Sequence, residues 1–411
     1  MSIIKKATAA AVIAIPIAML AACGGGGDGS TPNTTIPGDS TTTPDPTTST
    51  PTTPTTPDPT NPDPTNPDPT TPDPTDNTDY SAPRASYAYI TQRGAAKGLG
   101  SILKCKVSDT DGALTDCADS GGGSFEGPIS LTFSGGYAYI VNKPVGAVAL
   151  EHTWLDPNIA HSIWKCSVDT ATGALSQCAD SGANEAVHID DFYSTGSYAY
   201  MVQRYGDMIL RCVVEGEGKV ANCTGFMDPA AFGLHEPASF AFVSDRFYVA
   251  NSNIDGSSVS MCMVDSASGE IPGCQDANAS SYVFDPAGEY NGAQPTGIVV
   301  NGPTAYIVSK ANKNVISCTI GSGGKFTSCV DNPLTGVSVD SLNRIALQGS
   351  YAYITNSSQA ASTGSVIKCE IGAGGQLKNC AAIPGLSFDS GPIDADSNGS
   401  DIRFLVTASQ Q

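Results

Sequence analysis

Apolar and polar residues alternate with a period of two over most of residues 86–408, and glycine or proline interrupts the alternation about every ten residues. This alternation places apolar side chains on one face of a β-strand, whereas a surface helix repeats its apolar positions about every 3.6 residues. Helical periodicity is absent from this stretch of the sequence. The pattern therefore predicts an all-β domain built from many short strands.

A tyrosine-rich apolar segment recurs at intervals of about 50 residues. Its copies are centred on Tyr89, Tyr139, Tyr200, Tyr248, Tyr306 and Tyr353, with a looser seventh copy at Phe404. A period of this length with four short strands in each unit is typical of a β-propeller. We expect an apolar first strand such as residues 128–133, then the tyrosine strand, then two strands that carry cysteines.

Twelve of the thirteen cysteines form six pairs, with ten or eleven residues between the members of each pair. The pairs are Cys105 with Cys117, Cys166 with Cys178, Cys212 with Cys223, Cys262 with Cys274, Cys318 with Cys329, and Cys369 with Cys380. A glycine turn at each midpoint places the two cysteines opposite one another on antiparallel strands. The spacing predicts six outer hairpins, each closed by a disulfide, and it is too wide for a cysteine-pair zinc site.

The number of blades depends on the C-terminal segment, residues 392–407, which reads as a further strand hairpin. This hairpin either completes the first blade, giving six blades, or forms a short seventh blade. Six cysteine pairs argue for six units and the residues before Tyr87 make a poor first strand, but the C-terminal segment adds a further first and second strand, and we expect seven blades.

The N-terminal residues read as a secretory signal, with Lys5 and Lys6 before a short apolar stretch. The quartet that ends at Cys23, Leu-Ala-Ala-Cys, resembles the lipobox of bacterial lipoproteins. The resemblance implies a signal peptide over residues 1–22, a lipid such as palmitate on Cys23, and attachment to the membrane through that lipid. Gly24 resembles the outer-membrane sorting class, on the periplasmic face or the cell surface. The alternative is a cleaved signal with a stray cysteine.

Residues 23–79 are rich in proline, threonine and aspartate and contain almost nothing apolar to bury. We expect a disordered, extended tether here, followed by the propeller domain over residues 80–411. The repeats resemble a broad group of bacterial propellers with a Tyr-Val-Thr-Asn second strand, which includes lactonase-like members. This resemblance covers residues 86–408 and implies a fold rather than an activity.

Charge and cysteine usage restrict the partners and the compartment. The net charge is −20 with a pI of about 4.3, and no lysine or arginine cluster occurs, so nucleic acid is not expected as a partner. Evenly paired cysteines fit an oxidising compartment, in agreement with a cell-envelope location. We expect a monomeric propeller.

Polar residues just before the inner strands are the candidates to face a ligand at the mouth of the central channel. These residues are Glu126, His188, His235, Glu236, Gln294, Asp340 and Ser390. His188 and His235, with Asp190, Asp191 and Glu236 nearby, suggest a divalent cation or an acid–base pair, although any water-filled channel mouth displays such residues. No cofactor is required, no metal is assigned, and no catalytic residue is assigned.

Three functions follow from these features. The leading hypothesis is a non-catalytic propeller lipoprotein that binds a protein or a glycan at the cell envelope. The second is a metal-dependent, lactonase-like hydrolase with its site at the channel mouth. The third is a scaffold for outer-membrane assembly.

Overall fold

The computed structural model describes residues 87–94, 98–143, 161–183, 188–226, 233–253, 257–278, 294–358, 362–390 and 400–405. The chain divides into two units, Met1–Asp76 and Asn77–Gln411, and every described residue belongs to the second. The predicted signal peptide, the predicted lipid attachment at Cys23 and the predicted tether therefore lie outside the described residues. Within the described ranges, no helix is long and apolar enough to cross a membrane.

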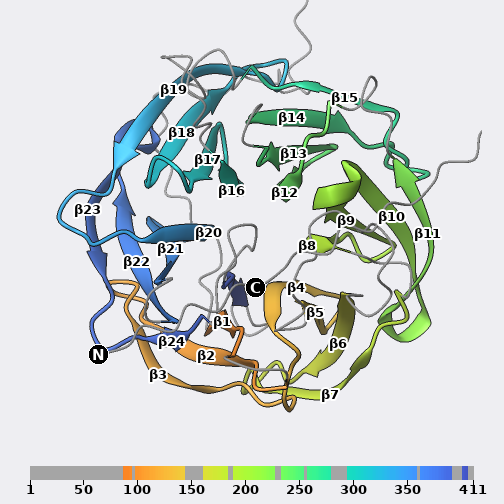
Figure 1. Ribbon diagram of the computed structural model, residues 1–411, viewed down its shortest axis with the longest axis horizontal. Coiled ribbons are helices and arrows are strands. Elements are labelled where there is room, and N and C mark those ends of the chain that lie inside the picture. Colours follow the sequence, from red (N-terminus) through yellow and green to blue (C-terminus); the bar gives the residue numbers. More distant parts are fainter. Residues whose placement is uncertain are drawn as a thin grey trace, which may run out of the picture. The chain divides into compact units, whose positions relative to one another are not determined.

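The second unit is a ring of six antiparallel blades, each with four strands that run in order from the axis outward (Figure 1). Blade one contains β25 (Ile402–Leu405), β1 (Tyr87–Gln92), β2 (Ser101–Val107) and β3 (Leu114–Asp119). Blade two contains β4 (Pro128–Ser134), β5 (Tyr137–Asn142), β6 (Ser162–Val168) and β7 (Leu175–Asp180). Blade three contains β8 (Ile189–Ser194), β9 (Tyr198–Gln203), β10 (Met208–Glu215) and β11 (Lys219–Phe226).

The remaining blades repeat this plan. Blade four contains β12 (Pro237–Val243), β13 (Arg246–Asn251), β14 (Ser258–Met263) and β15 (Gly273–Asp276). Blade five contains β16 (Pro295–Asn301), β17 (Thr304–Ser309), β18 (Asn314–Ile320) and β19 (Phe326–Pro333). Blade six contains β20 (Ser341–Gln348), β21 (Tyr351–Ser358), β22 (Thr363–Ile371) and β23 (Leu377–Ala382), and the short β24 (Phe388–Asp389) pairs with β22.

The prediction of seven blades is wrong, because the C-terminal strand completes the first blade. Strand β25 pairs antiparallel with β1, so that Leu405 lies opposite Tyr87 and Ile402 lies opposite Ile90. Phe404 therefore belongs to an innermost strand and is not a seventh copy of the tyrosine motif. This pairing gives blade one its innermost strand and closes the ring.

The predicted disulfides are confirmed, since all six cysteine pairs are bonded within their own outer hairpins. The bonds join Cys105 to Cys117, Cys166 to Cys178, Cys212 to Cys223, Cys262 to Cys274, Cys318 to Cys329, and Cys369 to Cys380. The first cysteine of each pair is fully buried between blades. The second cysteine, on the outermost strand, is only half-buried. Each bond therefore ties the exposed edge of its blade to the buried third strand.

The predicted register of the outer hairpins is correct in two blades and needs correction in four. Cys262 lies directly opposite Cys274 in blade four, and Cys318 lies directly opposite Cys329 in blade five. In blades one, two, three and six the register shifts at the first cysteine, where two outer-strand residues oppose one. The second members of these pairs, Cys117, Cys178, Cys223 and Cys380, each follow a residue with positive φ, namely Asp116, Gln177, Asn222 and Asn379. A β-bulge thus accompanies the disulfide in four of the six hairpins.

The first cysteine of each pair also has a characteristic neighbour on the second strand. It lies opposite the small residue between the two tyrosines of the motif, as Ala88 lies opposite Cys105 and Ala138 opposite Cys166. The alanine leaves room on the blade face for the disulfide. In blade four, Phe247 takes the place of alanine opposite the buried cysteine.

In five of the six blades the second tyrosine of the motif joins its blade to the next one. Its hydroxyl donates a hydrogen bond to the carbonyl of the glycine in the neighbouring blade's outer turn, as from Tyr89 to Gly173 at 2.6 Å and from Tyr200 to Gly269 at 2.8 Å. Burial raises the pKa of Tyr200 to about 12, so the hydroxyl keeps the proton that it donates. The repeated Tyr-Ala-Tyr segment is therefore a blade-to-blade latch as well as a strand.

The apolar core lies between adjacent blades. One cluster, for example, combines Tyr248 and Met261 of blade four with Ile298 and Phe326 of blade five. Each blade therefore buries both faces of its sheet against its two neighbours, which is why the propeller needs the closed ring to shield all of its apolar surface.

Candidate functional site

The inner strands bring one equivalent residue from each blade towards the ring axis. In blades two to five this residue lies opposite the residue that comes two positions after the second tyrosine of the motif. In blades six and one that place is held by a threonine, whose hydroxyl accepts the backbone N–H of Arg344 or Asp401. The six residues are Ser130, Asp191, Ser239, Gly297, Arg344 and Asp401. In blades two to six the strand register shifts around this position, so that a β-bulge marks the same step.

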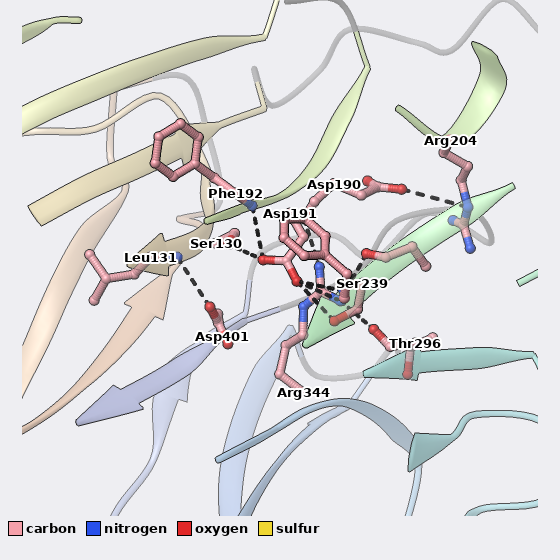
Figure 2. Close-up of polar contacts among 12 residues, drawn as sticks. Ser130, Leu131, Asp190, Asp191, Phe192, Arg204, Ser239, Thr296, Arg344 and Asp401 are labelled. Atoms are coloured by element: carbon pink, nitrogen blue, oxygen red, sulfur yellow. Dashed lines mark hydrogen bonds and ion pairs between the residues drawn. The ribbon is translucent and has the colours of Figure 1, made fainter. Parts of the chain in front are cut away.

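Asp191 stands at the centre of a buried network of polar contacts (Figure 2). Its Oδ1 accepts a hydrogen bond from Ser130 Oγ at 2.7 Å, and its Oδ2 accepts one from Ser239 Oγ at 2.8 Å. The backbone N–H groups of Phe192 and Phe240 donate to the same carboxylate at 3.0 and 3.3 Å. Asp191 thus holds together the inner strands of blades two, three and four.

Arg344 joins blade six to three other blades through backbone carbonyls. Its Nη2 donates to the carbonyl of Asp190 at 2.6 Å, and its Nη1 donates to the carbonyl of Ala238 at 2.9 Å and to that of Thr296. The same Nη1 lies 4.0 Å from Asp191 Oδ2. Because the Arg344 side chain is fully buried, these partners replace the water that a guanidinium needs.

Arg403 and Asp401 complete the network from the C-terminal strand. Arg403 Nε lies 3.0 Å from Asp401 Oδ2, and Arg403 Nη2 lies 3.3 Å from Asp191 Oδ1. Asp401 Oδ2 also accepts the backbone N–H of Leu131 at 3.1 Å. The C-terminal strand of blade one is therefore tied to blade three by an ion pair and to blade two by a backbone hydrogen bond.

The two carboxyl groups respond differently to this environment. Burial by itself raises the pKa of Asp191, but Arg344 and Arg403 outweigh burial and hold the pKa below the usual aspartate value. For Asp401 burial prevails, and its pKa is raised in spite of Arg403. Asp191 is therefore the firmly ionised member and Asp401 the more easily protonated one.

Three of the predicted mouth residues share a backbone conformation. His188, Glu236 and Gln294 each precede an inner strand with positive φ of 56°, 50° and 45°, and Gly127 occupies the same position in blade two. The carbonyl of each accepts a hydrogen bond from the residue after the second strand of its blade, as Glu236 does from Ser252 at 2.9 Å. The same backbone hydrogen bond therefore closes the open end of the hairpin formed by the first and second strands in each of these blades.

The other predicted residues do not join one cluster. Glu126 lies one residue before the turn position of Gly127, and His235 and Asp340 are exposed. The backbone N–H groups of His235 and Asp340 are held by the side chains of Asn251 and Asn356. Ser390 is buried and lies apart from the inner strand, because β25 rather than residue 392 begins the last inner strand.

A second polar cluster gathers where the inner strands of blades three and four begin. Arg204 Nε lies 3.6 Å from Asp190 Oδ2 and 3.8 Å from Glu236 Oε2. The ring of His188 lies between those of His161 and Tyr205, with centroid distances of 5.6 and 5.2 Å. The structure therefore brings His188 and Glu236 to one end of the channel, together with Arg204 and His161.

The histidines of this cluster are held neutral. Burial, followed by the charge of Lys143, lowers the pKa of His161 well below the usual value, and the same two causes lower the pKa of His188. Among the described residues, no three histidine, cysteine, aspartate or glutamate side chains are grouped closely enough to hold a metal ion.

Comparisons with known proteins support the fold. No protein-family model and no curated protein matches the sequence. A chain of the nidogen/laminin complex is 12% identical with a TM-score of 0.51, and the match covers 79% of this chain and 100% of that one. A periplasmic gluconolactonase of Pseudomonas aeruginosa is 14% identical with a TM-score of 0.49, covering 78% of this chain and 85% of that one.

A Bacteroides fragilis protein assigned provisionally as a 6-phosphogluconolactonase is also 14% identical, with a TM-score of 0.48, over 75% of this chain and 83% of that one. The match to the nidogen/laminin chain supports the fold, and identities this low carry no statement about activity. The blades and the axis define a six-bladed β-propeller with disulfide-closed outer hairpins and an ion-paired centre.

The axial network was missed by reasoning on the sequence, although a signal for it is present. Inner strands are buried, and charged residues in buried strands need partners. Arg344, Asp401 and Arg403 interrupt otherwise apolar strands of this kind. Charged residues at equivalent steps of separate repeats therefore indicate a network across the axis.

Proposed function

We propose that this protein is a lipid-anchored component of the bacterial cell envelope whose propeller is a non-catalytic binding module for a protein or a glycan. The observation that carries the proposal is the occupied axis. Asp191, a buried carboxylate at the axis, is engaged by two hydroxyl groups, two backbone N–H groups and two arginines. Such a carboxylate stabilises the ring and has little capacity left for chemistry.

The arrangement of the connections supports a binding face at one end of the propeller. The connections that precede the inner strands and those that follow the second strands leave from the same end. Three of them are long: residues 143–161, 277–294 and 383–401, the last of which contains β24. At the opposite end the strands are joined by tight turns, such as that between β4 and β5. Long connections on a rigid ring are a common location for recognition.

The anchor rests on the lipobox-like quartet at Cys23 and is tested by labelling. Full-length protein and a Cys23→Ser variant are expressed in a Gram-negative host with radioactive palmitate. We expect label and membrane association in the wild type and neither in the variant. Equal labelling of the two proteins contradicts lipidation at Cys23.

Photo-crosslinking in whole cells tests the binding module. A photoreactive amino acid replaces exposed His235 at the end with the long connections, and exposed Ser322 in an outer turn at the opposite end is the matched control. We expect a discrete crosslinked species from position 235 that is absent from position 322. Turnover of lactones by the full-length protein, stimulated by a divalent ion, supports the hydrolase instead.

A further inference from the structure

Three buried polar side chains at the end where the inner strands begin have hydrogen-bonding atoms without hydrogen-bond partners. These atoms are both amide atoms of Asn142, Nε2 of His161, and Oδ2 of Asp190. Asn142 is 0% exposed, His161 4% and Asp190 3%. An unsatisfied buried polar group destabilises a fold by about 1–3 kcal/mol, so three together on adjacent strands need an explanation.

The repeat shows what Asn142 lacks. Asn251 and Asn356 occupy the equivalent position in the second strands of their blades. Asn251 accepts the N–H of His235 and donates to two serine hydroxyls at 2.9 Å, and Asn356 accepts the N–H of Asp340 at 3.0 Å. Asn142 makes none of these bonds. In blades four and six this asparagine therefore stabilises its blade, whereas in blade two its amide is uncommitted.

The three side chains lie on neighbouring backbone positions. Asn142 pairs with Ser162, the residue after His161, across β5 and β6. His161 Nδ1 lies 2.8 Å from the carbonyl of Ile189, the residue before Asp190. Strand pairing and this hydrogen bond therefore place the three groups in sequence across the junction of blades two and three.

The unsatisfied atoms are mostly acceptors. A carbonyl only accepts, so Nδ1 of His161 is the donor to Ile189, and the neutral ring leaves a lone pair on Nε2. The Asp190 carboxylate has an ion pair with Arg204 at 3.6 Å but no hydrogen bond to Oδ2. Asn142 adds one acceptor and one donor. Acceptors on the protein need donors on the ligand. Phosphate and carboxylate groups offer mainly acceptors, whereas a hydroxyl-rich ligand offers several donors and therefore fits this site better.

Two aromatic side chains adjoin these groups and are partly exposed. His188 packs edge-on against His161, and Tyr205 packs edge-on against His188. Binding sites for small ligands combine such apolar surface with a few fixed polar groups. We propose that Asn142, His161 and Asp190 form a carbohydrate-binding site whose acceptors receive hydroxyl protons of one sugar residue. The inference rests on the proposed function and narrows its partner to a glycan.

The test compares two asparagines in equivalent positions. Purified full-length protein in detergent is screened on an array of bacterial and host oligosaccharides, and the strongest binder is titrated calorimetrically. The variants are Asn142→Leu and the matched control Asn251→Leu, with His161→Gln as a second change at the site. Inorganic phosphate and acetate are titrated as anionic controls.

The wild type is expected to bind an oligosaccharide, and Asn142→Leu to weaken that binding by about tenfold or more with an unchanged or raised melting temperature. His161→Gln is expected to weaken binding as well. Asn251→Leu is expected to lower the melting temperature and leave the affinity unchanged, because its amide holds the blade.

Absence of carbohydrate binding by the wild type overturns the inference, as does full binding by Asn142→Leu or binding of phosphate in place of sugars. If no oligosaccharide on the array binds but a protein is crosslinked from position 235, the carbohydrate site is contradicted and the proposed binding function is retained. No binding on the array and no crosslink contradict both.

Discussion

The hydroxyl of Tyr353 in blade six donates a 2.6 Å hydrogen bond to the carbonyl of Gly112 in blade one, across 241 positions of the sequence. The same contact recurs around the ring, and in blade five Tyr306 lies against Gly375, where an added Cβ would come 3.1 Å from its hydroxyl. Together with the pairing of β25 and β1, this bond closes the propeller. The ring is thus fastened near the axis and again at its outer turns.

Removing the latch hydroxyl tests its contribution. Tyr353→Phe deletes the bond and leaves the buried Gly112 carbonyl without this donor, so we expect the free energy of unfolding to fall by about 1–2 kcal/mol. Tyr351→Phe is the matched control, since this ring packs under Lys368, a contact that Phe retains. Urea unfolding of the two variants measures the difference, and equal stabilities contradict the latch.

Adding a methyl group at the latch glycine has a larger effect. Gly112 has a φ of +66°, and a Cβ there would lie 2.5 Å from the Tyr353 hydroxyl. Gly112→Ala combines the conformational cost of about 1–2 kcal/mol with a steric clash. Gly135→Ala, at a φ of +59° with open space around it, carries only the conformational cost. Equal melting temperatures for Gly112→Ala and Gly135→Ala would show that the steric clash at Gly112 does not contribute.

The axial network predicts that removing Arg344 alone destabilises the propeller more than removing Arg344 and Asp191 together. Arg344→Met leaves the buried carboxylate of Asp191 with one arginine fewer and removes three donors to backbone carbonyls. We expect a loss of about 3–5 kcal/mol. A further Asp191→Leu change removes the uncompensated charge and is expected to recover part of this loss. If the double variant is no more stable than Arg344→Met in urea unfolding, the charge argument fails.

The hairpin disulfides are expected to contribute independently. Replacing Cys105 and Cys117 together by alanine opens a loop with a sequence separation of 12. The chain-entropy estimate for a loop of this length is about 3 kcal/mol, and we expect a loss of that order in blade one. Peptide mapping without reductant should find the other five pairs unchanged, and any bond between blades contradicts pairing within the hairpins.

Stability should fall as the pH drops through the histidine range. The folded-state pKa of His161 lies well below its unfolded value near 6.5, so the unfolded chain binds protons that the folded chain does not. Its contribution is complete above about pH 6.5 and declines by at most about 1.4 kcal/mol per pH unit below it. His161→Gln should flatten the unfolding free energy between about pH 7 and 5, and an unchanged slope assigns the dependence to other groups.

The sequence by itself determined the parts of the fold that depend on neighbouring residues. Alternation with a period of two, glycine turns and cysteines at fixed spacing are local features, and they specified the strands, the hairpins, the six disulfides and the propeller class. The same local character explains why Tyr89 was recognised as a strand residue but not as a donor to Gly173 in the next blade.

Only the tertiary structure decided what depends on closure. Whether β25 completes blade one or begins a seventh blade depends on which free edge it meets, and that edge belongs to β1, more than 300 positions away. The axial contacts of Asp191, Arg344 and Arg403 likewise join strands from different blades. Hydrogen bonds and ion pairs act over a few ångströms in space, whereas a sequence records only distance along the chain, so these partners emerge when the ring brings the repeats together.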